Sequence, residues 1–242
     1  MIPRLRAFGL APLLLLAFAA SGAVAHATPA QFPKDAATSP AVRYAQLGKG
    51  ACEAELSRRG IRFSESGNAR GVLAPVRLGA PLHGVSFRTE LPTKTRATTP
   101  YEIGDCRLVL ALDDFAAILA KHDILEVHHY SMYRPPGAHF PAGTLGARHA
   151  GALAIDAAKF IKKDGTILDV ERDFHGRIGT ETCGAGTGPD PATPAALELR
   201  EIVCEAADAH LFNVQLTPDY NWDHRNHFHL EVTANAKWFI VH

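Results

Sequence analysis

Three histidines lie within six residues near the end of the chain, and their types and spacing suit metal chemistry: His224, His227 and His229. From His227 onward polar and apolar residues alternate, and in a β-strand successive side chains point to opposite faces. His227, His229 and Glu231 are therefore expected to share one face of a strand. Histidine is the commonest protein ligand for metals, so paired imidazoles on one face suit a divalent ion.

A second candidate segment runs from Arg148 to Asp156. In a strand, the side chain of Asp156 would point away from those of Leu153 and Ile155. His149 precedes them across a glycine-containing turn. His149, Asp156 and one histidine of the tail make a three-ligand set with an open fourth position, as a catalytic zinc site requires. The alternative is a strand of stacked histidines held by backbone partners, without a metal.

Arg134 follows a predicted strand and stands before the run Pro135-Pro136-Gly137. A guanidinium offers two parallel N–H donors in a fixed fork. Arg134 is therefore a candidate for holding a substrate carboxylate or a developing oxyanion. The alternative is an arginine at a strand end that faces only solvent.

Hydrophobic patterning predicts the elements that must position these residues. Helices are expected over 42–59, 108–119 and 195–211. Strands are expected over 124–133, 152–156 and 166–170 and in the tail from Val214, with a glycine- and proline-rich loop over 175–194. Helices followed by antiparallel-looking strands predict an α+β fold. We expect a single domain in which flanking helices support a small antiparallel sheet that carries the zinc site.

The start of the chain has the features of an export signal. Residues 1–27 combine a basic start, an apolar run over 8–20 and a small-x-small cleavage pattern, as in a secretory signal peptide. An uncleaved anchor is the alternative, but the run is short for a membrane span. Residues 28–41 are expected to be a flexible lead-in and 42–242 the folded domain. We expect a periplasmic or secreted protein without stable membrane insertion after cleavage.

The four cysteines fit an exported protein, in which an even count favours disulfides. Pairing near neighbours in sequence predicts Cys52–Cys106 and Cys183–Cys204. The alternative, a zinc–cysteine site, lacks the C-x-x-C spacing. The 25 basic residues balance 25 acidic ones, for a formal net charge of zero. Bulk charge thus gives no reason to expect a nucleic acid or an anionic membrane surface as a partner.

As a set, these motifs resemble those of the LAS metallopeptidases, which include D-Ala-D-Ala carboxypeptidases, murein endopeptidases and the hedgehog domain. The matching residues are His149, Asp156, His227 and His229, with Tyr133 and Arg134 ahead of them. Within that group, the tail from Leu216 to His229 and the segment 151–165 are most similar to the bacterial extensin-like C-terminal domain family. The resemblance covers roughly residues 45–233.

The resemblance implies a site and an activity. His149, Asp156 and His229 would bind Zn²⁺, with water in the fourth position. His224 and His227 would act beside the metal as acid–base or orienting groups, and Arg134 would hold the substrate or its oxyanion. The implied activity is cleavage of peptide bonds in peptidoglycan stems or cross-links by a metal-activated water, as an endopeptidase or a carboxypeptidase.

The chain departs from these enzymes where a general base is expected. The carboxypeptidase branch has glutamate where Asn226 stands, and the hedgehog-like branch has glutamate where Asp223 stands. Ala147 occupies a position where serine is frequent. The base therefore stays open among Asp223, His224 and His227.

Two other classes of function remain open. One is a non-catalytic zinc-containing module that binds cell-wall peptides, because losing the base would leave binding intact. The other is a disulfide-stabilised structural domain without a metal, in which His149→Ala would have no effect on bound zinc.

Overall fold

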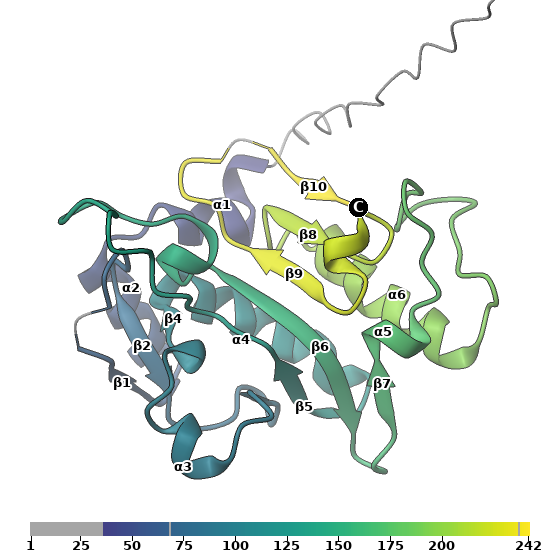
Figure 1. Ribbon diagram of the computed structural model, residues 1–242, viewed down its shortest axis with the longest axis horizontal. Coiled ribbons are helices and arrows are strands. Elements are labelled where there is room, and N and C mark those ends of the chain that lie inside the picture. The colour runs from purple at the N-terminus through teal and green to yellow at the C-terminus, as the bar shows by residue number, and fades with distance from the viewer. Residues whose placement is uncertain (1–35, 68, 237) are drawn as a thin grey trace, which may run out of the picture.

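The computed structural model describes residues 36–67, 69–236 and 238–242. The expected signal peptide, residues 1–27, and most of the expected lead-in lie outside the described residues. In the part that is described, helices pack against two β-sheets (Figure 1). This arrangement confirms the α+β class.

The first helical segment is divided in two. A 3-10 turn, η1 (Ala36–Thr38), precedes α1 (Pro40–Ala45), and α2 (Lys49–Arg58) follows after a break. The single helix expected over 42–59 is therefore wrong. The break lies at Gly48, which is extended (φ −75°, ψ 164°) and caps α2. Glycine is acceptable as an N-cap and unfavourable inside a helix, so it favours a new start here.

The two long helices follow the predicted apolar patterns. They are α4 (Cys106–Lys121) and α6 (Pro194–Asp208). Asp105 caps α4 by accepting from the backbone N–H of Arg107, and Thr193 caps α6 by accepting from that of Ala196. Two single-turn helices, α3 (Thr93–Arg96) and α5 (Val170–Asp173), complete the set. In Figure 1, α4 lies behind the large sheet, where it packs against β5 and α6.

The large sheet has seven strands within the described residues. In spatial order they are β10 (Ile240–Val241), β8 (Val214–Leu216), β9 (Phe228–Glu231), β6 (Ala154–Lys162), β5 (Ile124–His129) and β3 (Ser86–Arg88), and β7 (Ile167–Asp169) pairs with β6. The β10–β8 and β3–β5 pairs are parallel and the others antiparallel. The expected small antiparallel sheet is thus a larger, mixed one, because the edge strands β3 and β10 each pair in parallel with a strand that does not directly adjoin them in the chain.

A smaller sheet contributes no residue to the predicted site. In order, its strands are β1 (Phe63–Glu65), β2 (Pro75–Leu78) and β4 (Gly104–Asp105), all antiparallel. The strand expected over 124–133 ends at His129, and the one expected over 152–156 continues as β6 to Lys162.

The register of β6 and β9 separates a polar face from an apolar one. Asp156 pairs with His229, and the neighbouring pair is Ile155 with Leu230. Apolar residues of both strands are fully buried in the main core: Ile155, Ala157, Phe228 and Leu230, together with Val232 beyond the end of β9. The alternation predicted for the tail is confirmed. The core therefore fixes these strands, and the opposite face is left for the polar residues.

All four cysteines are paired as predicted. Cys52–Cys106 joins α2 to the start of α4, and Cys183–Cys204 joins the loop over 174–193 to α6. Two disulfides point to an oxidising, extracytoplasmic compartment. No helix among the described residues has both the length and the apolar character needed to cross a membrane.

Candidate metal centre

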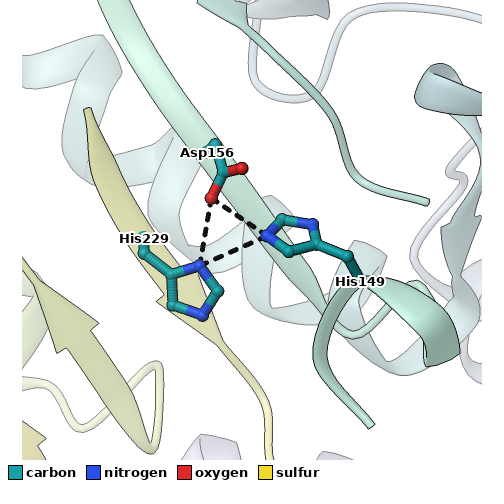
Figure 2. A group of neighbouring side chains, drawn as sticks. All are labelled: His149, Asp156 and His229. Atoms are coloured by element: carbon teal, nitrogen blue, oxygen red, sulfur yellow. Dashed lines mark hydrogen bonds and ion pairs between the residues drawn. The ribbon is translucent and has the colours of Figure 1, made fainter. Parts of the chain in front are cut away.

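Three buried side chains converge from separate elements (Figure 2). Asp156 comes from β6 and His229 from the adjacent position of β9. His149 comes from the 3-10 turn η3 (Arg148–Gly151), which leads into β6. A Cβ at Gly151 would lie 2.2 Å from the carbonyl oxygen of Gly146, so only glycine permits this close packing of the turn.

The distances in the cluster suit a small cation. Oδ1 of Asp156 lies 3.0 Å from Nε2 of His149 and 3.0 Å from Nδ1 of His229, and the two nitrogens are 3.3 Å apart. Tetrahedral bonds of ~2.0–2.1 Å to zinc would place ligand atoms about 3.3 Å apart. The cluster could therefore hold a metal ion with little movement.

The outer nitrogens of both histidines are occupied. Nδ1 of His149 donates to the carbonyl oxygen of Met132 at 2.9 Å, and Nε2 of His229 lies 3.2 Å from a carboxylate oxygen of Glu231. Since these oxygens only accept, a neutral ring directs its lone pair toward Asp156. Three electron-pair donors then face one another and need a cation between them, a proton or a metal. Metal-bound histidines usually have such outer partners.

The ionisable side chains of the cluster shift one another's pKa values. Burial alone would raise the pKa of Asp156, but hydrogen bonds from His149 and His229 hold it well below its usual range. Burial opposes protonation of His229, but the carboxylates of Asp156 and Glu231 raise its pKa. Glu231 is also buried, and its bond with His229 lowers its pKa. The site thus favours positive charge at its centre.

Two more histidines lie beside the cluster, each oriented by an asparagine. Nδ1 of His227 donates to Oδ1 of Asn226 at 2.8 Å, and its Nε2 lies 3.4 Å from Oδ1 of Asp156. Nδ1 of His224 donates to Oδ1 of Asn221 at 2.7 Å. Burial lowers the pKa of His227 to about 4 and also lowers the pKa of His224. Both rings are therefore neutral at pH 7, with a free lone pair on Nε2.

The other predicted residues take different positions. Nη2 of Arg134 lies 3.3 Å from Oδ2 of Asp156, and 56% of the arginine side chain is exposed. The guanidinium thus contacts Asp156 on one side and solvent on the other. Asp223 is exposed in the 3-10 turn η4 (Trp222–His224), next to His224 and outside the cluster.

Sequence reasoning missed the residues that support the ligands. The alternation in the tail had placed Glu231 on the same face as His229, which was the available signal for its role. The orienting roles of Asn221 and Asn226 had no signal beyond their nearness to histidines. The ring of Tyr130 packs edge-on against that of His227, with 5.8 Å between centroids, and no sequence signal indicated this contact.

The family model described as the extensin-like protein C-terminus matches residues 50–241, which include the whole cluster. No curated protein and no solved structure matches the chain.

Proposed function

This chain belongs to the extensin-like protein C-terminus family, and we propose that it is an exported zinc-dependent peptidase acting on peptidoglycan peptides. The observation that carries the proposal is the convergence of three buried ligand atoms. Each of the three side chains also makes a polar contact with a residue outside the cluster. His149, Asp156 and His229 would hold the ion. When bound, zinc would polarise a carbonyl and lower the pKa of water.

The donor set favours zinc without excluding other metals. Two imidazoles and one carboxylate bind several divalent ions, and the choice among them depends on geometry and supply. Three protein ligands leave a position for water or substrate, which distinguishes a catalytic zinc site from a closed structural one. His227 is near enough to Asp156 to contact whatever occupies that position.

The residues beside the cluster supply proton transfer and charge. Nε2 of His227 accepts a proton from the attacking water as the water oxygen bonds to the carbonyl carbon. The same imidazolium then donates that proton to the amine as the C–N bond breaks. Arg134 holds the developing oxyanion or a substrate carboxylate, because its guanidinium is exposed on one side and anchored to Asp156 on the other. His224 is the second candidate for the base.

The substrate class rests on location. Two disulfides favour an oxidising compartment outside the cytoplasm, and peptidoglycan peptides are substrates available there. A non-catalytic module that binds the same peptides would need the zinc ligands and would not need neutral histidines with free lone pairs. The orientation of His224 and His227 by Asn221 and Asn226 therefore favours the peptidase.

The first test is the metal content of the mature protein purified from the periplasm. We expect about one zinc per chain by elemental analysis, lost in Asp156→Ala and in His229→Ala. His122→Ala serves as the matched control, because this histidine lies at the end of α4 beside Glu205. A folded wild type without any metal would overturn the proposal.

The second test separates cutting from binding. We expect the zinc-loaded protein to release peptides from purified sacculi, and we expect His227→Ala to keep its zinc and lose this activity. Zinc-loaded protein that binds sacculi and leaves them uncut would instead establish the binding module.

A further inference from the structure

A cavity of about 450 Å³ lies between the segment that follows β7 and the turn η4, which contains His224. Its lining combines apolar and charged side chains, among them Glu171, Phe174, Ile178, Trp222 and Arg225. Ligand cavities often combine an apolar wall with a few polar groups that fix orientation.

The cavity adjoins the proposed catalytic histidines. Trp222 and Arg225 flank His224 in the chain, and the rings of His224 and His227 are 5.2 Å apart. Tyr130 contacts the ring of His227, and burial together with the nearby charge of Glu171 raises the pKa of its phenol. The turn η4 therefore connects the cavity to the side of the cluster where the proposed catalytic histidines lie.

Arg225 is held in place by the cavity wall. Its guanidinium stacks over the ring of Trp222, 4.6 Å from the centroid, and Nη1 donates to the carbonyl oxygen of Trp222 at 3.1 Å. The stacking uses the face of the guanidinium and leaves N–H donors at its edge for an anion. Arg225 forms no ion pair with any described residue.

Glu171 gives the cavity an opposite charge. It is exposed in α5, and its carboxylate makes no ion pair with any described residue, Arg225 included. A fixed cation and a free anion thus line one cavity without neutralising each other. A ligand that carried only one charge would satisfy only one of them.

We propose that this cavity is a subsite for a substrate side chain that ends in both an ammonium and a carboxylate. Glu171 binds the ammonium, Arg225 binds the carboxylate, and the methylenes of the side chain pack against the exposed side chains of Ile178 and Trp222. The inference rests on the proposed function, because it assigns the substrate that the metal centre would cut.

The test uses four N-acetyl-Ala-X-Ala peptides that differ only in the charges of X. X is 2,6-diaminopimelate (both charges), lysine (ammonium), 2-aminopimelate (carboxylate) or norleucine (neither). Binding is measured by calorimetry on the full mature chain after chelation, so that nothing is cut. We expect the doubly charged peptide to bind about three- to tenfold more tightly than either singly charged one.

Two variants assign the charges to residues. Glu171→Gln should abolish the preference for diaminopimelate over aminopimelate, and Arg225→Gln should abolish the preference for diaminopimelate over lysine. The controls are Glu201→Gln on α6 and Arg43→Gln on α1, because Arg43 also lies over an aromatic ring. Both controls should bind like wild type. Equal affinity for all four peptides, or preferences that survive both variants, would overturn the subsite.

Failure of the subsite is distinguishable from failure of the proposed function. A charge preference that depends on Glu171 and Arg225, in a protein that leaves sacculi uncut, would support the subsite and contradict the peptidase. Cleavage of sacculi by a protein without that preference would support the peptidase and overturn the subsite.

Discussion

At the scale of single residues, Glu231 holds His229 in the tautomer that a metal ligand needs. Its carboxylate lies 3.2 Å from Nε2 of His229 and also accepts from the hydroxyl of Thr233 at 2.8 Å. We expect Glu231→Gln to weaken zinc binding by about 10- to 100-fold with all three ligands in place, as for other outer partners. Competition with a chromophoric chelator measures this affinity.

The control for this substitution is the same change at Glu201, an exposed residue of α6. Glu201→Gln should bind zinc like wild type. If Glu231→Gln did so too, the carboxylate would have no part in holding the metal.

Asn226 and Asn221 allow the two candidate bases to be separated. Each asparagine oxygen accepts from Nδ1 of one histidine, so its loss frees that ring to change tautomer. We expect Asn226→Ala to lower kcat on sacculus-derived peptides about tenfold or more while zinc content is unchanged. Asn221→Ala, which acts on His224, should have the smaller effect.

Nitrogen NMR of the imidazole rings supplies a readout that general instability would not produce. It should show Nδ1 of His227 losing its fixed proton in Asn226→Ala alone. A larger loss of kcat in Asn221→Ala would assign the base to His224.

At the scale of elements, sequence patterning predicted what is local and missed what depends on distant pairing. The apolar spacing of α4 and α6 and the alternation in β9 are local, and all three are confirmed. The parallel pairing of β3 with β5 and of β10 with β8 joins segments far apart in the chain, so no local pattern indicates it. The continuation of β6 beyond Asp156 was missed for the same reason, since its partners are β5 and β7.

In the candidate site, too, the local features could be predicted from the sequence, and the contacts that depend on distant pairing could not. Strand alternation placed His229 and Glu231 on one face, and the resemblance to a family supplied the partners of His229. The contact of Met132 with His149 and that of Tyr130 with His227 arise just beyond the end of β5, beside β6. Sequence patterning cannot predict these contacts, because they depend on how the two strands pair.

Asp219 ties the loop over 174–193 to α6 and to the tail. This fully buried carboxylate accepts from the backbone N–H of Arg177 at 2.7 Å and from the hydroxyl of Thr182 at 3.0 Å, and it forms an ion pair with Arg200 at 3.0 Å. Arg200 in turn stacks on Phe174, a wall of the cavity. We expect Asp219→Asn to lower the free energy of unfolding by about 3 kcal/mol, because it leaves the guanidinium charge buried and unpaired. Urea denaturation measures the loss.

A double variant tests that reason. Asp219→Leu combined with Arg200→Met removes both charges and should be less destabilised than Asp219→Leu alone. A double variant that lost the full sum of the two single effects would show that the pairing contributes nothing.

At the scale of the whole molecule, the large sheet has the candidate metal ligands Asp156 and His229 on one face and the core on the other, and His129 is an exception to that division. It pairs with Ala157, a core residue of β6, and is buried. Neither ring nitrogen has a hydrogen-bond partner among the described residues. An unpaired buried imidazole disfavours the charged form. Burial accordingly lowers the pKa of His129 to about 3.

This pKa makes the folding stability depend on pH. Below the ordinary histidine pKa of about 6.5 the unfolded chain binds a proton at His129, while the folded chain does not until the pH nears 3. The free energy of unfolding therefore falls as the pH falls from 6.5 toward 3, by up to roughly 1.4 kcal/mol per pH unit from this residue. Above pH 6.5 the residue contributes no pH dependence.

Replacing His129 with leucine removes both the unpaired nitrogens and this titration. We expect His129→Leu to be more stable than wild type, and the difference in unfolding free energy to grow by roughly 2.7 kcal/mol between pH 7.5 and pH 4.5. Urea denaturation of chelator-treated protein across that range measures it, and subtracting wild type cancels the titration of the metal cluster. His139→Leu, at an exposed position, controls for loss of a histidine. A difference that stayed constant with pH would mean that the buried ring accepts its proton as readily in the folded chain as in the unfolded one.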